Sequence, residues 1–271
     1  MRPFFKNHVL QQQPFKPMII VVDTTKAGSA SNTFVLPITK AASETVKIYW
    51  GDGTSSMGVN GDNPHVYAAS GVYTVKIESK VFGGIYFVLA GDKEKLLSVR
   101  TFGRGIIRSL YHTFSGCSNL AIINDSTLIN TSESCSSTFF GCSSLTALPL
   151  IDLSSATNTS YMCYQCTSLS SVPLINLSNV TETVYMFCQC SALTNIPLLD
   201  LSSVTNAEGM FSGCTLTTQS YSDFLINLAT LPLQSGVSFH GGYSKYNVAG
   251  GVARAYLISN FGWTITDGGA A

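Results

Sequence analysis

The residues of this sequence best suited to chemistry are its eight cysteines. A thiolate binds metals, forms disulfides or attacks an electrophile, so the spacing of the thiols decides which role is open. Five cysteines recur at a nearly constant interval, namely Cys117, Cys142, Cys166, Cys190 and Cys214. The remaining three hold no common phase, and they are Cys135, Cys163 and Cys188.

This spacing leaves disulfides, a metal site and reduced structural thiols to be weighed. Cys163 and Cys166 form an isolated C-x-x-C pair, and the four histidines are scattered, which does not match a metal site. Phased cysteines in stacked repeats would all point the same way, and a buried free cysteine behaves as a small hydrophobe. We therefore favour reduced structural cysteines and expect neither a metal nor a cofactor.

Other catalytic patterns are missing from the sequence. It contains no G-x-S-x-G, H-E-x-x-H, phosphate-binding loop or dinucleotide fingerprint. His112 and His240 have no Cys or Ser partner in a known nucleophile motif. Asp152 and Asp200 share one repeat offset with Asn176 between them, which predicts a ladder bonded to turns rather than a catalytic pair. We predict a protein that is not an enzyme.

The elements that must position the cysteines form a repeat from about Phe114 to Leu216. Leucine follows the first four phased cysteines by three residues, and proline recurs at one offset, at Pro149, Pro173 and Pro197. A short, constant period with leucines at fixed offsets is typical of a solenoid, in which each repeat buries its neighbour. The residues three before each phased cysteine are Phe114, Phe139, Cys163, Phe187 and Phe211.

Each repeat is predicted to contain two kinds of local structure. Leu169–Leu177 is short and rich in branched apolar residues, which predicts an extended arm. Tyr185–Cys190 predicts one tight helical turn that directs Met186, Phe187 and Cys190 inward.

The repeat resembles the leucine-rich repeats of the BspA-like surface proteins of the lipoprotein 285 type. The resemblance is carried by Met210–Cys214 and Leu198–Thr205 and extends over most of the repeat region. It implies a right-handed solenoid used for adhesion. The repeat from Cys117 to Cys142 lacks the proline and the Leu-Ser-Ser run, so we expect it to be a capping repeat.

The N-terminal part is predicted to be β-structure. Met18–Asp23, Thr33–Ile38 and Val46–Trp50 are predicted strands, and Gly51–Thr54 is a predicted tight turn. The order W-G-D-G, H-x-Y and G-x-Y-x-V resembles a PKD domain, an immunoglobulin-like β-sandwich. The resemblance implies structural roles for Trp50, Asp52, His65, Tyr67 and Tyr73. A Ca²⁺ site at Asp52, Asp62 and Asn63 is the alternative, although it lacks EF-hand spacing.

Flanking segments complete a mainly β fold. Ile85–Leu89 and Leu96–Arg100 are predicted short strands, and Ile106–Leu110 starts the repeat rhythm. After the repeats, Ser220–Leu228 and Gly250–Ile258 are predicted helices, with Gly236–Phe239 and Phe261–Gly269 as short strands. This end resembles the terminal cap of BspA-like proteins encoded by phages. We divide the chain into a docking arm at 1–17, a PKD-like sandwich at 18–80, a solenoid with entry coils at 81–216, and a cap at 217–271.

Charge is unevenly distributed although the formal net charge is zero. Residues 1–108 carry thirteen Lys and Arg against seven Asp and Glu, whereas residues 109–244 carry seven Asp and Glu and no Lys or Arg. Because phosphate contacts need cations, the repeats are not expected to bind nucleic acid. The asymmetry reflects either a lightly charged Ser/Thr surface or an electrostatic contact between neighbouring copies.

The sequence also limits where the protein is found. Met1–Leu10 holds no apolar run of a secretory signal, and no segment reaches the roughly 18 apolar residues of a membrane span. The resemblances imply a non-enzymatic phage virion protein, either a tail adhesin that attaches to the host or a capsid decoration or baseplate protein. An exported bacterial cell-surface adhesin is the remaining alternative.

We expect the partners to be other virion proteins, reached through residues 1–17 and the sandwich, together with further copies of this chain. The host-side partner would be a surface glycan or protein, and no membrane insertion is expected. Tyr161, Tyr164 and Tyr185 are the candidate ligand contacts, because exposed tyrosines stack on sugars. The alternative places these rings at the edge of the core with their hydroxyls in water.

Overall fold

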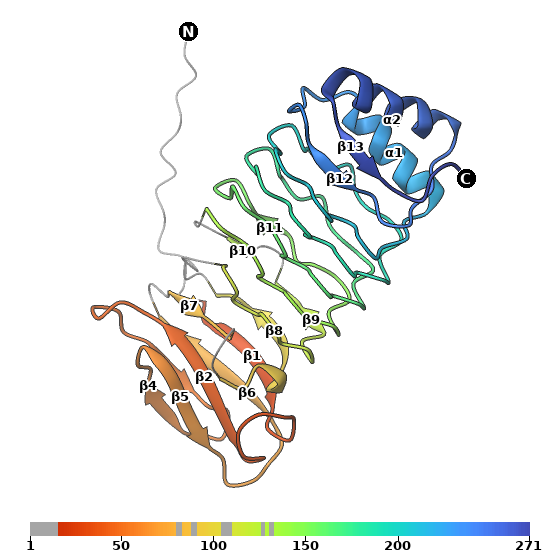
Figure 1. Cartoon of the computed structure of the whole chain (residues 1–271). Coiled ribbons are helices and arrows are strands. Elements are labelled where there is room, and N and C mark those ends of the chain that lie inside the picture. The colour runs from red at the N-terminus through yellow and green to blue at the C-terminus, as the bar shows by residue number, and fades with distance from the viewer. Residues whose placement is uncertain (1–15, 80–82, 88–90, 104–109, 126–127, 130–132) are drawn as a thin grey trace.

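The computed structural model describes residues 16–79, 83–87, 91–103, 110–125, 128–129 and 133–271. The described chain is mainly β: two sheets lie at the N-terminal end, a stack of coils follows, and two helices lie at the C-terminal end (Figure 1). Most of the predicted docking arm at 1–17 lies outside the described residues. So do parts of the predicted strands Ile85–Leu89 and Ile106–Leu110.

Two β-sheets form the N-terminal part. The larger sheet has the order β4-β3-β6-β1-β8-β9, and the smaller has the order β5-β2-β7. Phe34, Leu36 and Ile38 alternate along β2 and are buried, as are Val75 and Ile77 on β6, because alternate side chains of a strand face one side. The strands are β1 (Met18–Asp23), β2 (Thr33–Thr39), β3 (Lys47–Tyr49), β4 (Ser55–Met57), β5 (Gly61–Val66), β6 (Val72–Glu78), β7 (Gly84–Ile85), β8 (Leu96–Thr101) and β9 (Ile122–Ile123).

Strand β8 belongs to both the sheets and the coils. It pairs antiparallel with β1, and its other edge pairs parallel with β9, where Ser98 lies opposite Ile122. Just before it, the short 3₁₀ helix η1 (Lys93–Lys95) ends at a fully buried lysine. Lys95 Nζ lies 3.5 Å from Asp92 Oδ2 and donates to the carbonyls of Ser29 and Thr33. These bonds offset the cost of burying the charge and tie the loop before β2 to the start of β8.

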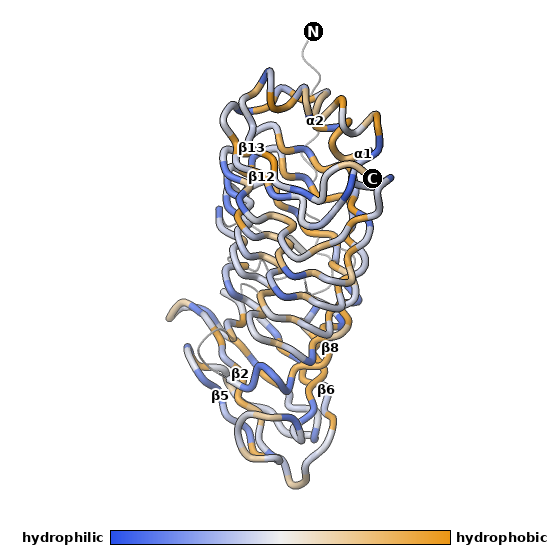
Figure 2. Tube along the Cα trace, turned by 45° about the vertical axis from the view of Figure 1, so that its right-hand side comes forward, coloured by the Kyte–Doolittle hydropathy of each residue, from blue (hydrophilic) through white to orange (hydrophobic). Residues whose placement is uncertain are grey.

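The coil stack (residues 110–216) is held together by parallel pairing between successive coils. The strand β10 (Leu128–Ile129) pairs with β11 (Ile151–Asp152), and single bridges link Asn158, Glu182 and Asn206, which share one phase of the repeat. Figure 2 shows apolar positions recurring at the same place in successive coils. The predicted extended arm Leu169–Leu177 forms no regular strand. It bonds to the preceding coil through a bridge at Ser171 and through the N–H of Ser170, which donates to the carbonyl of Thr146.

The helical turn predicted at Tyr185–Cys190 is wrong, because the segment is a series of tight turns. Every second N–H, at Tyr185, Phe187 and Gln189, donates to a carbonyl of the next coil, while the N–H groups between them donate three residues back. A helix would direct all of its N–H groups along one axis and leave the next coil unpaired. The inward direction predicted for Met186, Phe187 and Cys190 is confirmed, since all three are fully buried.

Each turn series contains two residues in the left-handed backbone region. One lies five residues before the phased cysteine and the other directly before it, with φ between 52° and 79°. At Gly213 a side chain would also clash with the neighbouring coil, because a Cβ there would lie 2.6 Å from Gln189 Nε2. The first set is His112, Ser137, Tyr161, Tyr185 and Gly209, and the second is Gly116, Gly141, Gln165, Gln189 and Gly213.

The C-terminal elements close the stack. Both predicted helices are confirmed as α1 (Thr218–Leu228) and α2 (Val248–Phe261), which begin at capping residues whose side chains accept backbone N–H bonds. The strands β12 (Ser238–His240) and β13 (Thr264–Thr266) pair in parallel and continue the stack. Phe211 of the last coil packs edge-on against Phe224 and Phe239.

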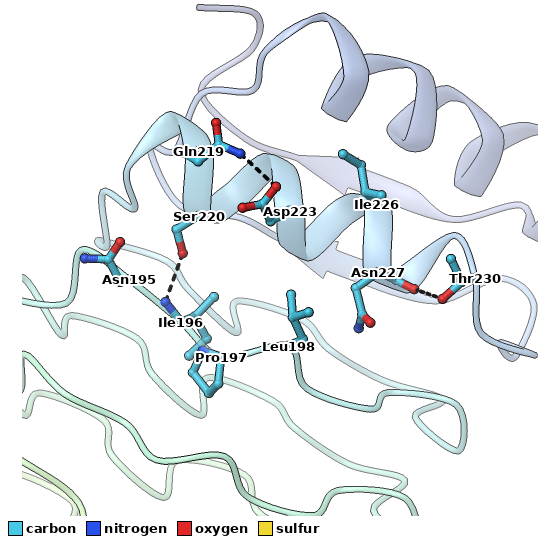
Figure 3. Close-up of a pocket in the computed structure, with 10 residues that line it drawn as sticks. All are labelled: Asn195, Ile196, Pro197, Leu198, Gln219, Ser220, Asp223, Ile226, Asn227 and Thr230. Carbon is cyan, nitrogen blue, oxygen red and sulfur yellow. Dashed lines mark hydrogen bonds between the residues drawn. The ribbon is translucent and has the colours of Figure 1, made fainter.

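A groove of about 560 Å³ runs along the seam between the last coil and α1 (Figure 3). The backbone N–H of Ile196 donates to Ser220 Oγ across this seam, at 3.0 Å. Farther along, Asn227 Nδ2 donates to the carbonyl of Leu199. The groove is therefore bridged by bonds that hold the cap in place.

We expect Phe187→Ala to lower the free energy of unfolding by about 3–5 kcal/mol, measured by urea denaturation. Phe187 is fully buried and stacks on Phe211 at 5.5 Å, so truncation leaves a cavity that neighbouring coils hold open. The control is Leu174→Ala, at a side chain that is 66% exposed, which should change stability by less than about 0.5 kcal/mol. Equal losses in the two variants would contradict this description of the core.

Candidate ligand-binding face of the coil stack

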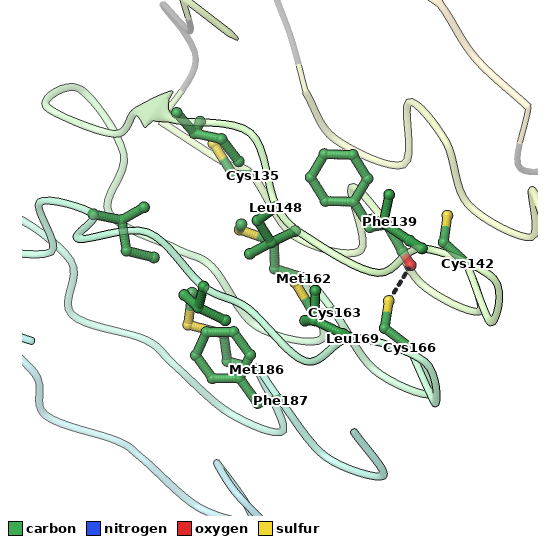
Figure 4. Close-up of a cluster of buried hydrophobic side chains, with 14 of the residues drawn as sticks. Cys135, Phe139, Cys142, Leu148, Met162, Cys163, Cys166, Leu169, Met186 and Phe187 are labelled. Atoms are coloured by element: carbon green, nitrogen blue, oxygen red, sulfur yellow. Dashed lines mark hydrogen bonds between the residues drawn. The ribbon is translucent and has the colours of Figure 1, made fainter. Parts of the chain in front are cut away.

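All eight cysteines are buried free thiols. Figure 4 shows Cys135, Cys142, Cys163 and Cys166 within a cluster of buried apolar side chains. Cys166 Sγ donates to the carbonyl of Phe139 at 3.1 Å, and the same bond recurs in neighbouring coils. Each such bond joins a coil to the one before it, so these thiols serve the stack itself. The other donors are Cys142 to Phe114, Cys190 to Cys163 and Cys214 to Phe187, at 3.0–3.1 Å.

Burial suppresses the reactivity of these thiols. It raises the pKa of Cys135 and of Cys214 to about 12. A thiol with so high a pKa is almost wholly protonated near neutral pH, and the protonated form is a poor nucleophile and metal ligand. Within the described residues, no group of three or more His, Cys, Asp or Glu side chains is placed to hold a metal ion.

The other chemical candidates of the coils have local bonding or packing roles. The side-chain oxygens of Asp152, Asn176 and Asp200 each accept the backbone N–H two residues ahead, at 2.9–3.0 Å. His240 Nδ1 accepts the N–H of Gly242, and the His112 ring packs edge-on against Tyr111. The predicted ladder of turn-bonded acids and amide is therefore confirmed.

The five residues of the predicted PKD-like motif come together between the sheets and the β3–β4 turn. The Trp50 ring stacks on His65 at 4.7 Å, and His65 Nε2 lies 2.8 Å from Asp52 Oδ2. The Tyr67 hydroxyl donates to the carbonyl of Trp50, and its ring stacks on Tyr73. These contacts join β3, β5 and β6 rather than forming an open site.

Two of the three alternative Ca²⁺ ligands, Asp52 and Asn63, bond to protein groups. Asn63 Oδ1 accepts the N–H of Val59, and its amide donates to backbone carbonyls. Partial burial tends to raise the pKa of Asp52, but hydrogen bonds from Thr54 and His65 outweigh this and lower it to about 2.

The three candidate tyrosines form one cluster on the coil stack. The ring centroids of Tyr161 and Tyr185 lie 5.3 Å apart, and that of Tyr164 lies 5.8 Å and 6.5 Å from them. Tyr164 also stacks on Phe140 of the preceding coil at 5.0 Å. Tyr161 is 37% exposed, and the other two are partly buried. The cluster, here called the tyrosine face (Tyr161, Tyr164 and Tyr185), thus packs at the core edge and still presents ring surface to solvent.

A hollow of about 490 Å³ adjoins the tyrosine face. Two of its lining residues, Gln165 and Gln189, were not predicted as site residues. The sequence did mark these two positions as exceptions, because glycine directly precedes the other three phased cysteines. The lining consists of Gly141, Ser143, Tyr164, Gln165, Thr167 and Gln189.

Leucine side chains form a second exposed feature. Leu150, Leu174 and Leu198 each lie eight residues after a phased cysteine and are 45%, 66% and 51% exposed. We call them the leucine row. A row of exposed apolar side chains at one phase is a candidate protein-contact surface.

One comparison with known protein families found a match to part of the chain. Residues 108–230 match a family described as "Mycoplasma protein of unknown function, DUF285". The searches of curated proteins and of solved structures gave no match. In the described part of the chain, the helices fall short of the length and apolar character needed to cross a bilayer.

We expect the native protein to resist thiol reagents. In the folded state at pH 7.5, a chromogenic disulfide reagent should label fewer than one thiol per chain within minutes, because burial excludes the reagent from all eight thiols and raises the pKa of Cys135 and Cys214. After unfolding in guanidinium, all eight thiols should react. Rapid native labelling of one full equivalent would contradict the assigned burial.

The N-terminal part should lose stability in acid through Asp52. Its folded pKa lies below its ordinary value of 3.8, so its carboxylate stabilises the fold above about pH 4 and loses that effect as pH falls through about 2. Asp52→Asn should flatten the fall in unfolding free energy over this range, measured by denaturant titration. Asp62→Asn, at an exposed position on β5, should keep the wild-type slope. Identical slopes in wild type and Asp52→Asn would refute the assignment.

Proposed function

We propose that this chain is a non-enzymatic attachment protein that binds a host-surface ligand through the tyrosine face. The observation that carries the proposal is the convergence of Tyr161, Tyr164 and Tyr185 beside a hollow. Partly exposed aromatic rings beside a polar concavity offer stacking surface and hydrogen bonds together. The rings are held by packing between coils, so little conformational entropy is lost on binding.

The proposal extends to the fold and its setting. We infer that the coil stack is a leucine-rich-repeat solenoid of the BspA-like type and that the two N-terminal sheets form a PKD-like sandwich. The parallel bridges at one phase of successive coils and the contacts of Trp50, His65 and Tyr67 support this. The sequence resemblance of the C-terminal cap to phage-encoded proteins supports a place on a virion. There, residues 1–17 and the sandwich would contact other virion proteins.

A second candidate function is favoured by the leucine row. If the chain is a decoration or baseplate protein, Leu150, Leu174 and Leu198 would be covered by neighbouring subunits, because apolar side chains in a row gain from burial. The two functions differ in which surface of the coil stack stays exposed in the assembled particle. An attachment protein keeps the tyrosine face free, whereas a shell protein buries the leucine row.

To test attachment, fluorescent full-length protein would be titrated onto host cells. We expect Tyr164→Ala and Tyr185→Ala each to weaken binding about tenfold or more, as loss of an aromatic anchor costs roughly 1.4 kcal/mol or more. Tyr243→Ala is the matched control, because this tyrosine is 69% exposed on the cap, away from the cluster. Thermal melting would verify that all variants stay folded. Binding unchanged in both cluster variants would refute the tyrosine face.

Immunogold electron microscopy of purified particles separates the two functions. Label at the tail tip or fibres supports attachment, and label over the head supports decoration. Particles without label would overturn both virion roles and support the exported bacterial adhesin.

A further inference from the structure

The two central coils carry unusual residues at their left-handed positions. Directly before the phased cysteine, Gln165 and Gln189 have φ of 60° and 62°, where Gly116, Gly141 and Gly213 occupy the same phase in the other coils. Glycine adopts this conformation freely, whereas a side chain makes it unfavourable. Strain of this kind often gathers at functional sites, so these two glutamines point to a role outside the fold.

The glutamines lie where a ligand would meet them. Both line the hollow beside Tyr164, and they occupy the same phase of two successive coils. Both are exposed, and among the described residues neither side-chain amide hydrogen-bonds to another protein group. In contrast, the hydroxyls of Ser143 and Thr167 in the same hollow already donate to the carbonyls of Ser118 and Ser143.

An amide suits one kind of ligand group in particular. Its oxygen accepts and its nitrogen donates hydrogen bonds, so it matches hydroxyl and acetamido groups, which also do both. Two amides on successive coils are separated by roughly one strand spacing, about 4.8 Å. This separation is comparable to the span of a single sugar ring. The adjacent Tyr164 ring supplies an apolar surface for the C–H face of that ring.

The charge around the hollow disfavours anionic ligands. Residues 109–244 contain no Lys or Arg, so no cation of the coils can pair with a carboxylate, sulfate or phosphate. Glu208 lies close enough to Tyr185 to raise the pKa of its phenol. A negatively charged sugar would be repelled by such a surface, whereas an uncharged sugar would not.

We infer that the hollow lined by Tyr164, Gln165 and Gln189 is a subsite for an uncharged pyranose of a surface polysaccharide, bound by the two amides and stacked on the tyrosine. This inference rests on the proposed attachment function and names its ligand class. Sialylated, sulfated and phosphate-bearing glycans are outside that class.

The test is a glycan array probed with the full-length chain. It would carry uncharged hexose and N-acetylhexosamine oligosaccharides beside their sialylated, sulfated and phosphate-bearing counterparts. We expect uncharged members to bind, and each anionic counterpart to bind at least tenfold more weakly. Binding should change little between low and high NaCl concentration, since no ion pair is formed.

The variants Gln165→Gly and Gln189→Gly separate a binding role from a structural one. Each removes an amide while restoring the residue found at the same phase in other coils, so the melting temperature should stay level or rise. Binding to the uncharged glycan should fall about tenfold. Ser137→Gly is the control, because it also places glycine at a left-handed position of a turn series and lies outside the residues that line the hollow.

Four results would overturn the inference. Glycine variants that bind as well as wild type would remove the glutamines from the site, and preferred binding of anionic glycans would refute the ligand class. A third result would be host-cell binding that depends on Tyr164 together with no binding to any glycan on the array. This result would support the attachment function and refute the sugar subsite. If the wild-type protein bound neither host cells nor any glycan, both the attachment function and the sugar subsite would be refuted.

Discussion

The structure depends on one backbone constraint, which is that every second N–H of each turn series must find a carbonyl on the next coil. At Tyr185, Phe187 and Gln189 these bonds run to Glu208, Met210 and Ser212. Because buried backbone groups cannot remain unpaired without a large cost, each coil stays in register with the next. That register then aligns residues of the same phase, and it is why Phe187 stacks on Phe211 and why the thiols of Cys142, Cys166, Cys190 and Cys214 each donate to a carbonyl of the preceding coil.

The same constraint separates what the coils must keep from what they can vary. Inward positions such as Met186 and Cys190 fill a continuous core and have little freedom. The left-handed positions are different, because the bonds on either side hold the backbone whether or not glycine is present. Tyr161, Gln165, Tyr185 and Gln189 occupy these positions in the two central coils, so the stack supports side chains that would be disfavoured in an isolated turn.

Much of this arrangement could be predicted from the sequence, for physical reasons that also explain the failures. The period, the inward residues and the two terminal helices followed from apolar spacing, which is a local signal. The turn at Tyr185–Cys190 was misread because its signature is glycine, and this coil has tyrosine and glutamine instead. The short edge strand β4 has three exposed residues and therefore no apolar alternation to detect.

Only part of the candidate site could be predicted from the sequence, because the rest depends on contacts between coils. Tyr161, Tyr164 and Tyr185 could be suspected by residue type, but their contact depends on the register between coils. Gln165 and Gln189 could have been found by asking which coils depart from glycine before the phased cysteine. Both departures fall in the coils that carry the tyrosines, and the flanking coils return to glycine at Gly141 and Gly213. A site confined to two coils of about 4.8 Å spacing has room for one or two sugar rings, so under the proposed function, tight binding to a long polysaccharide would require several copies to bind at once.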